Sequence, residues 1–152
     1  MSGSPIFLET KLRRSEGPHT LSDGVGIYAR HWLPEGRHKG VVCIVHGLGE
    51  HCGRYDELAQ QLGAAGYATC GFDLRGFGKS PGRRGHLRFA RALRDIDEML
   101  GDARGRAGGA PVFLYGHSLG GLLALLYGLE YRPSLAGVVT TGAALHTVLR
   151  EQ

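Results

Sequence analysis

The sequence contains few cysteines and no long apolar run, and each shortage excludes a class of protein. Its 152 residues include three cysteines, an odd number that does not build the disulfide framework of a small secreted domain. The longest apolar run, 122–127, is far shorter than the roughly 20 residues that span a bilayer. The amino-terminal residues show no basic region followed by an apolar one, so no secretory signal is expected and a cytoplasmic location is predicted. Cys43 and Cys70 lie in apolar, strand-like runs and are expected to be buried free thiols.

Sequence signals for nucleic-acid binding are also missing, although the formal net charge is +4. Basic side chains are densest over residues 79–94, and Asp95, Asp97 and Glu98 follow directly. This stretch is interpreted either as a patch for anionic lipid or nucleic acid, or as a solvated loop and helix face. No nucleic-acid motif accompanies the charge, so the solvated surface is favoured and no nucleic-acid partner is expected. The basic residues are Lys79, Arg83, Arg84, Arg88, Arg91 and Arg94.

Complete nucleotide-binding motifs are absent as well. Residues 78–80, Gly-Lys-Ser, end like a phosphate-binding loop, but Asp73 stands where that motif requires its first glycine. The two Gly-x-Gly pairs, 47–49 and 76–78, lack the third glycine of a dinucleotide fingerprint, because Cys52 and Pro81 occupy that position. Nucleotide binding is therefore disfavoured.

The apolar runs that are present alternate with stretches of helical periodicity, which is typical of an α/β domain with a mainly parallel sheet. A single domain over 1–152 is expected from the length. The run 27–33 alternates with period two and stops at Pro34, which predicts an early antiparallel strand. The expected strands are 27–33, 41–45, 67–73, 111–115 and 135–141, and the expected helices are 55–65, 89–103 and 118–130.

The most informative motif is Gly-x-Ser-x-Gly at residues 116–120, between the expected strand 111–115 and an apolar helix. A strand, a sharp turn and a helix form the context of a nucleophile elbow, in which the serine hydroxyl stands exposed above the sheet. Ser118 is therefore the candidate nucleophile. In a chain with 26 glycines, chance alone produces the bare motif about one time in five. The alternative is a serine that caps the following helix.

A second glycine-rich turn follows the buried strand 41–45. In acyl-transfer enzymes with this layout, this loop and the residue after the nucleophile each contribute one backbone N–H to the oxyanion hole. These groups are the N–H of Leu48 and the N–H of Leu119. Because parallel strands end at the same edge of a sheet, the two turns should be spatial neighbours. Gly47 and His117 are assigned to substrate binding, and His117 is not expected to act as a base.

Together these segments resemble the α/β-hydrolase superfamily, most closely the monoacylglycerol lipase / lysophospholipase group, which is also classed with the S33 serine aminopeptidases. The resemblance covers about 20–144. It implies hydrolysis of a lipid-like carboxylic ester by Ser118, without a metal or organic cofactor, and it allows peripheral contact with a membrane. The segments that carry it are 46–51 (HGLGEH), 54–55 (RY), 73–80 (DLRGFGKS), 83–86 (RRGH) and 116–121 (GHSLGG).

The resemblance covers the first part of that fold only, because the triad order in the superfamily is Ser, then Asp or Glu, then His. After Ser118 the sequence has no Asp, and its remaining candidates are Glu130, His146 and Glu151. Glu130 falls about 18 Å along the expected helix, too far to orient an imidazole. His146 stands where family members begin their lid. The acid, the base, the lid and the last strands are thus expected to be absent, and the strand 135–141 to form an open edge that favours self-association.

Two other functions stay open at this point. A non-catalytic module that binds an acyl ligand or a partner protein would keep the same motifs. Peptidase or thioesterase chemistry on the same fold would also keep them, because the nucleophile and the oxyanion hole are common to all three reactions.

Overall fold

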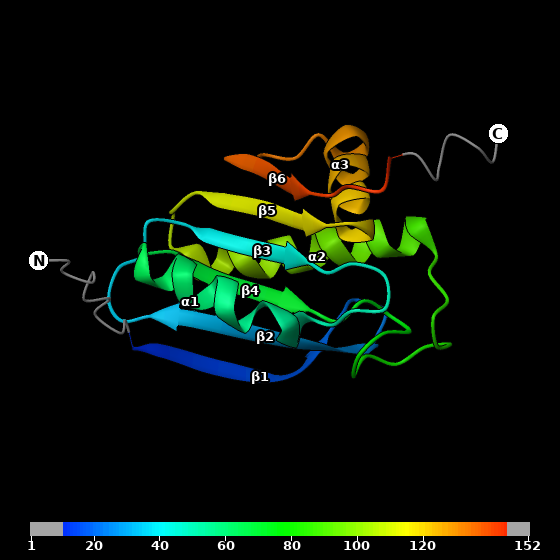
Figure 1. Ribbon diagram of the computed structural model, residues 1–152, viewed down its shortest axis with the longest axis horizontal. Coiled ribbons are helices and arrows are strands. Elements are labelled where there is room, and N and C mark those ends of the chain that lie inside the picture. The colour runs from blue at the N-terminus through cyan, green and yellow to red at the C-terminus, as the bar shows by residue number, and fades with distance from the viewer. Residues whose placement is uncertain (1–10, 146–152) are drawn as a thin grey trace, which may run out of the picture.

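The computed structural model describes residues 11–145, which form a six-stranded sheet with helices on both faces (Figure 1). None of the described helices combines the length and the apolar character needed to cross a membrane. In chain order the elements are β1 (Leu12–Thr20), β2 (Gly26–Pro34), β3 (Val41–Val45), the 3₁₀ turn η1 (Cys52–Tyr55), α1 (Asp56–Ala64), β4 (Ala68–Phe72), α2 (Phe89–Ala107), β5 (Val112–His117), α3 (Leu119–Tyr131) and β6 (Gly137–Thr141).

The strand order is β1-β2-β4-β3-β5-β6. β1 pairs with β2 and β2 with β4 in antiparallel fashion, while β4, β3, β5 and β6 are parallel neighbours, which confirms the mainly parallel sheet. From β3 the chain passes through α1 to β4 on one side, then crosses back through α2 to β5 on the other side. α1 therefore covers the front face in Figure 1, and α2 and α3 cover the back. The carboxyl ends of β3 and β5 form the switch point of the sheet, where α/β folds place their ligands.

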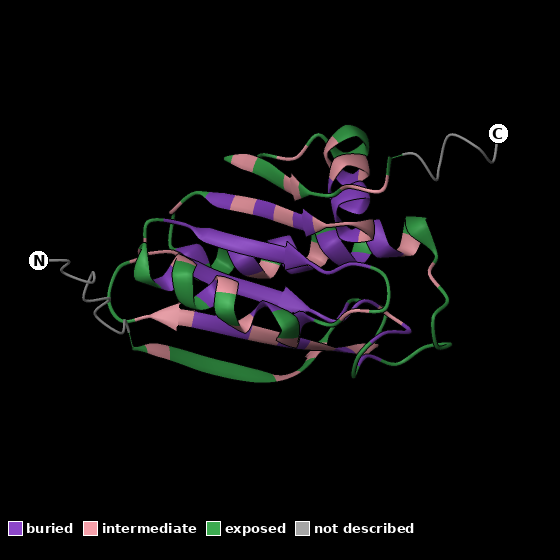
Figure 2. Cartoon of the chain, viewed as in Figure 1, coloured by how far each residue is buried: buried purple, intermediate pink, exposed green. Residues whose placement is uncertain are grey.

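The core lies between the sheet and the two rear helices (Figure 2). Every residue of β3 and β4 is buried, as the continuous apolar run over 41–45 predicts for a strand covered on both faces. The helical spacing of Phe89, Leu93, Ile96 and Leu100 in the sequence predicts that they share one buried face of α2. Leu93, Ile96 and Leu100 are buried, but Phe89 is 41% exposed. Phe89 is the first residue of α2, next to the loop that leads into the helix.

The sequence patterns do not predict one of the strands, β1. Its sequence, LRRSEGPHT, is polar, and its side chains are exposed or half-buried. The strand is held by antiparallel pairing along the whole of β2, and Pro18 is tolerated because β1 lies at the sheet edge. The predicted helix 55–65 begins with η1 and ends at Ala64, just before Gly66, which adopts a φ of 92°. Cys43, Cys52 and Cys70 are free and buried, which confirms the prediction for the first and last.

Candidate active site

Ser118 forms the turn between β5 and α3. Its backbone angles, φ 53° and ψ −116°, lie where residues other than glycine are strained, and such strain is concentrated at functional sites. The side chain occupies the N-cap position of α3 without making a cap hydrogen bond, which contradicts the helix-capping alternative. Ser118 is half-buried instead of exposed as predicted, because Gly47 packs against it. The Ser118 N–H donates to the Thr141 carbonyl oxygen over 2.9 Å and ties the elbow to β6.

The two outer glycines of the elbow lie where neighbouring backbone excludes a side chain. A Cβ at Gly116 would overlap the carbonyl group of Gly120, one turn ahead. A Cβ at Gly120 would overlap the carbonyl oxygen of Val45, at the end of β3. The glycines thus allow α3 to begin close beneath the turn and the elbow to lie directly against the adjacent strand.

The turn after β3 lies against the elbow. A Cβ built on Gly47 would be 3.3 Å from the Cβ of Ser118, so the two glycine-rich turns are in contact. The Glu50 N–H donates to the Gly47 carbonyl oxygen over 3.2 Å, and Gly49 has a φ of 70°, as the third position of a type II turn requires. Leu48 stands at the tip of this turn, with 67% of its surface exposed.

The carboxylate of Glu50 fixes the shape of this turn. One oxygen accepts the Gly47 N–H over 2.7 Å and the Tyr55 hydroxyl over 2.9 Å. Burial opposes ionisation of Glu50, but the hydrogen bonds from Gly47 and Tyr55 outweigh it, and the pKa of Glu50 is lowered. An ionised carboxylate therefore holds the backbone beside Ser118 in place. The motif contains Glu50, but nothing in its spacing indicated this role.

His46 is fully buried and connects the same turn to the segment after β4. Its Nε2 accepts the N–H of Leu74 over 2.9 Å, so Nδ1 carries the proton and donates to the carbonyl oxygen of Gly47 over 2.8 Å. Burial lowers the pKa of His46, which keeps the ring neutral. With both nitrogens occupied, His46 is a positioning residue.

The segment after β4 folds around the buried carboxylate of Asp73. One Asp73 oxygen accepts the N–H of Cys52, the first residue of η1, over 2.7 Å, and the other accepts the N–H of Lys79 over 2.8 Å. Gly78 has a φ of 49° and lies so close to the carboxylate that a Cβ would overlap it. Residues 78–80 thus enclose a negative charge, which would repel a phosphate group.

The side chain of His117 is directed toward β6. Its Nδ1 lies 2.9 Å from the Thr141 Oγ1, and the Tyr115 hydroxyl lies 3.0 Å from the same oxygen. The three side chains share one face of neighbouring strands, because β5 and β6 run parallel with His117 opposite Thr141. His117 is thereby held at the rim of the elbow.

Three polar groups of the two turns are unpaired in the described part of the chain. Among residues 11–145, the Ser118 hydroxyl and the N–H groups of Leu48 and Leu119 make no hydrogen bond within the protein. In the same part of the chain no histidine or carboxylate contacts the Ser118 hydroxyl, and Glu130 is exposed near the far end of α3. His146 lies outside the described residues.

Comparison with known proteins places this arrangement among hydrolases. The family model described as serine aminopeptidase, S33, matches residues 36–150. The chain is 37% identical to a monoacylglycerol lipase of Mycolicibacterium smegmatis over 134 residues, 88% of this chain and 48% of that protein. It is 38% identical to human monoglyceride lipase over 128 residues, 80% of this chain and 41% of that protein. The chain thus spans about half the length of these relatives, or less.

Solved structures that resemble this chain are also hydrolases. A monoacylglycerol lipase of Paleococcus ferrophilus superimposes with a TM-score of 0.64 at 36% identity, covering 89% of this chain and 44% of that one. A thermostable carboxyl esterase of Bacillus coagulans superimposes with a TM-score of 0.76, covering 87% of this chain and 45% of that one. At 24% identity, the likeness to the esterase is a likeness of fold.

Proposed function

This chain belongs to the serine aminopeptidase, S33, family of α/β-hydrolases, and we propose that it provides the nucleophile and the oxyanion hole of a serine hydrolase of lipid-like carboxylic esters. The family is the one that the sequence motifs indicate. The observation that supports the proposal is the contact between Gly47 and the strained Ser118. Within residues 11–145 the N–H groups of the neighbouring Leu48 and Leu119 make no hydrogen bond. The substrate class is supported by the relatives, two of which are lipases of monoacylglycerols, and by the exposed Leu48 at the edge of the site.

In the proposed reaction the Ser118 Oγ attacks the ester carbonyl carbon, and the C=O electron pair moves onto the oxygen. The N–H groups of Leu48 and Leu119 stabilise that oxyanion. When the carbonyl re-forms, the alcohol leaves with a proton, and the acyl group remains on Ser118 until water hydrolyses it. The Ser118 proton needs a base, and none contacts the hydroxyl among residues 11–145. We therefore expect the 152-residue chain to be a slow esterase, because several orders of magnitude in rate depend on the base.

The sharpest test removes one oxyanion donor and leaves the rest of the turn unchanged. Leu48 is the second residue of its turn, a position that proline favours, so Leu48→Pro deletes the N–H with little change of backbone. Leu48→Ala keeps the N–H and is the matched control. We expect the 152-residue chain to hydrolyse p-nitrophenyl butyrate slowly. Leu48→Pro should lower the rate above buffer by about 100-fold or more, and Leu48→Ala should retain most of it.

Ser118→Ala, measured beside them, reports on the nucleophile. A fast wild-type rate that Ser118→Ala abolishes would show that a base is present and that the expected slow turnover is wrong. Equal rates for Leu48→Pro and Leu48→Ala would refute the oxyanion hole and favour the non-catalytic module. Circular dichroism of each variant verifies that the fold is retained.

A further inference from the structure

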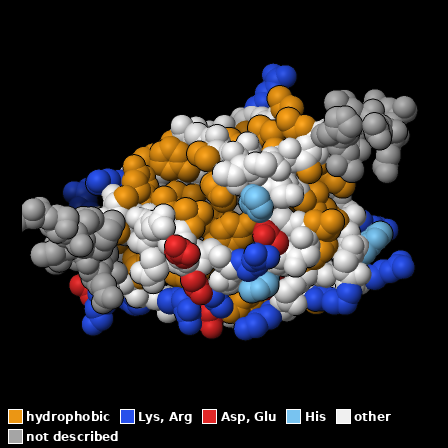
Figure 3. Space-filling view, viewed as in Figure 1, with side chains coloured by type: hydrophobic (Ala, Val, Ile, Leu, Met, Phe, Trp, Pro, Cys, Tyr) orange, Lys and Arg blue, Asp and Glu red, His pale blue; other side chains and the backbone are white. Residues whose placement is uncertain are grey.

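The loop between β4 and α2 carries a strong positive charge, and its one acid, Asp73, is buried and accepts hydrogen bonds from backbone N–H groups. No Asp or Glu occurs from residue 74 to residue 94, whereas seven Lys or Arg side chains do. Four of them lie exposed on the loop or at the start of α2 and are called here the basic rim. Figure 3 shows Lys, Arg and His side chains at the right-hand end of the molecule, where Figure 1 places this loop. The basic rim consists of Lys79, Arg83, Arg84 and Arg88.

The charge of the basic rim is not neutralised by neighbouring carboxylates. Within residues 11–145, none of its four side chains forms an ion pair. Arg84 donates to backbone carbonyl oxygens of its own loop, among them Gly78 at 3.0 Å. Lys79 places its Nζ over the ring of Tyr28, 4.7 Å from the centroid. The rim therefore keeps its full charge for an external anion.

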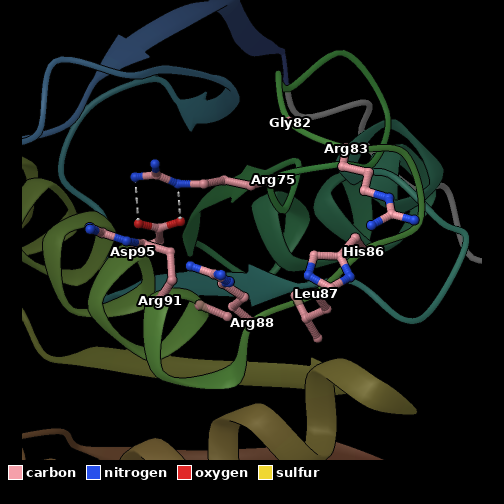
Figure 4. Close-up of a pocket in the computed structure, with 9 residues that line it drawn as sticks. Arg75, Gly82, Arg83, His86, Leu87, Arg88, Arg91 and Asp95 are labelled. Carbon is pink, nitrogen blue, oxygen red and sulfur yellow. Dashed lines mark hydrogen bonds and ion pairs between the residues drawn. The ribbon is translucent and has the colours of Figure 1, made fainter.

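Behind the rim, the loop and α2 enclose a cavity of about 150 Å³ (Figure 4). The side chains of Arg83, His86 and Arg88 line it in the close-up. Asp95 also lines the cavity. Its two carboxylate oxygens accept hydrogen bonds from Arg75 over 2.7 and 2.9 Å.

Exposed apolar side chains lie along the same edge of the sheet. Phe89, directly after Arg88, is 41% exposed, and Leu48 beside the elbow is 67% exposed. The loops that carry them are in contact, because the Leu74 N–H donates to the ring of His46. Charge, apolar side chains and the elbow thus share the edge where the parallel strands end.

We propose that the basic rim docks the protein on the surface of an anionic lipid bilayer, with the cations against lipid phosphates and Phe89 in the interfacial layer. Cations beside an exposed aromatic suit a surface that offers negative charge above an apolar interior. A nucleic acid supplies the charge but no apolar interior for Leu48. The benefit of docking, delivery of a lipid ester to Ser118, depends on the proposed function, whereas docking itself is measured without turnover.

The test is sedimentation of the 152-residue chain with vesicles of phosphatidylcholine mixed with phosphatidylglycerol. Arg83→Glu/Arg88→Glu is compared with Arg37→Glu/Lys39→Glu, which makes the same charge change at the opposite end of β3. We expect the rim variant to bind at least about 25-fold more weakly, because each basic side chain near an anionic surface contributes about fivefold. The control variant should bind like the wild type. Raised salt should release the wild type, and pure phosphatidylcholine should bind it weakly.

Phe89→Ala separates the apolar contribution from the charge. It should weaken binding severalfold while leaving the salt dependence unchanged, since no charge is removed. Equal losses for the two double variants would show that net charge alone drives binding, and would overturn the proposal. Tight binding to a single-stranded oligonucleotide without binding to vesicles would overturn it in favour of nucleic acid. Thermal melting verifies that each variant is folded.

Discussion

At the scale of single residues, the site depends on two glycines that permit close approach of backbone. Gly116 and Gly120 contact carbonyl groups of α3 and β3 where any Cβ would overlap. Gly128 lies in the same helix as Gly120, but a Cβ there would meet nothing within 4 Å. Helical propensity is the same for the two glycines, so the difference between them isolates the effect of the close approach.

We expect Gly120→Ala to lower the free energy of unfolding by about 3 kcal/mol or more, because the added methyl group meets backbone that cannot move independently. Gly128→Ala should raise it by up to about 1 kcal/mol through helix propensity. Urea unfolding followed by circular dichroism measures both. A stable Gly120→Ala protein would show that β3 and the elbow are not in close contact.

The sequence predicts which residue is the candidate nucleophile, but it does not predict the hydrogen bonds that hold the backbone around Ser118 in place. The motif around Ser118 is local, and its turn geometry is set by five consecutive residues. The roles of Glu50 and His46 depend on partners brought close by folding, such as Leu74, which is 28 residues from His46. The exposure of Ser118 was predicted wrongly for the same reason, because the Gly47 turn that covers it comes from another strand.

At the scale of elements, the loop after β4 is fixed to α2 by a buried ion pair. Arg75 donates hydrogen bonds to both carboxylate oxygens of Asp95, whose side chain is 2% exposed. It also donates a hydrogen bond to a carboxylate oxygen of Asp23 over 2.7 Å. Burial raises the pKa of Asp95, and the hydrogen bonds from Arg75 oppose that rise. Asp102 and Arg106 form a second pair on the same helix, at 2.9 Å, in which the Arg106 side chain is 42% exposed. Asp102 also lies 3.0 Å from Nε2 of His31, so it has a second partner.

Arg75→Met should destabilise the protein by about 3 kcal/mol or more, because it leaves the carboxylate of Asp95 buried without its partner. Arg106→Met should lower the free energy of unfolding by only about 0.5 kcal/mol, because Arg106 is exposed and Asp102 keeps its contact with His31. Differential scanning calorimetry at neutral pH compares the two. Equal shifts in Tm would indicate that water reaches Asp95 and that the loop is not fixed by this pair.

The helices and strands with a clear apolar pattern in the sequence were predicted, whereas β1, which has none, was missed. Runs such as 41–45 are apolar enough to predict a buried strand by themselves, and β3 matches that range. β1 forms because β2 offers an edge to pair with, and its own polar sequence carries no signal for a strand. Phe89 was assigned to the buried face of α2 by spacing alone, and as the first residue of the helix it is 41% exposed.

At the scale of the whole molecule, β6 is an open edge among the described residues. It pairs with β5 on one side, and no other described strand pairs with it. Val138 and Val139 are 39% and 51% exposed on this strand. The free backbone N–H and C=O groups of such an edge strand can pair with a strand of another chain.

We expect the 152-residue chain to form dimers or larger species at micromolar concentrations. Val139→Lys should shift the population toward monomer, because a lysine on an edge strand opposes pairing with a like-charged copy. Gln60→Lys, at an exposed position of α1, makes the same charge change away from the sheet edge and serves as the control. Light scattering after size exclusion measures the mass. A monodisperse wild-type monomer would refute the prediction.

The position of β5 beside β3 has a consequence for the order in which the chain folds. Leu48 and Leu119 lie about 70 residues apart in the sequence, and the segment between them contains β4 and the whole of α2. Their turns come together only when β5 pairs with β3. Closing so long a loop costs entropy before the contacts it allows can form, so we expect the pairing of β3 with β5 to be a slow, late step of folding. A reagent that binds the two turns together should therefore bind only chains whose sheet is complete. It should not bind chains in which only local hairpins and helices have formed.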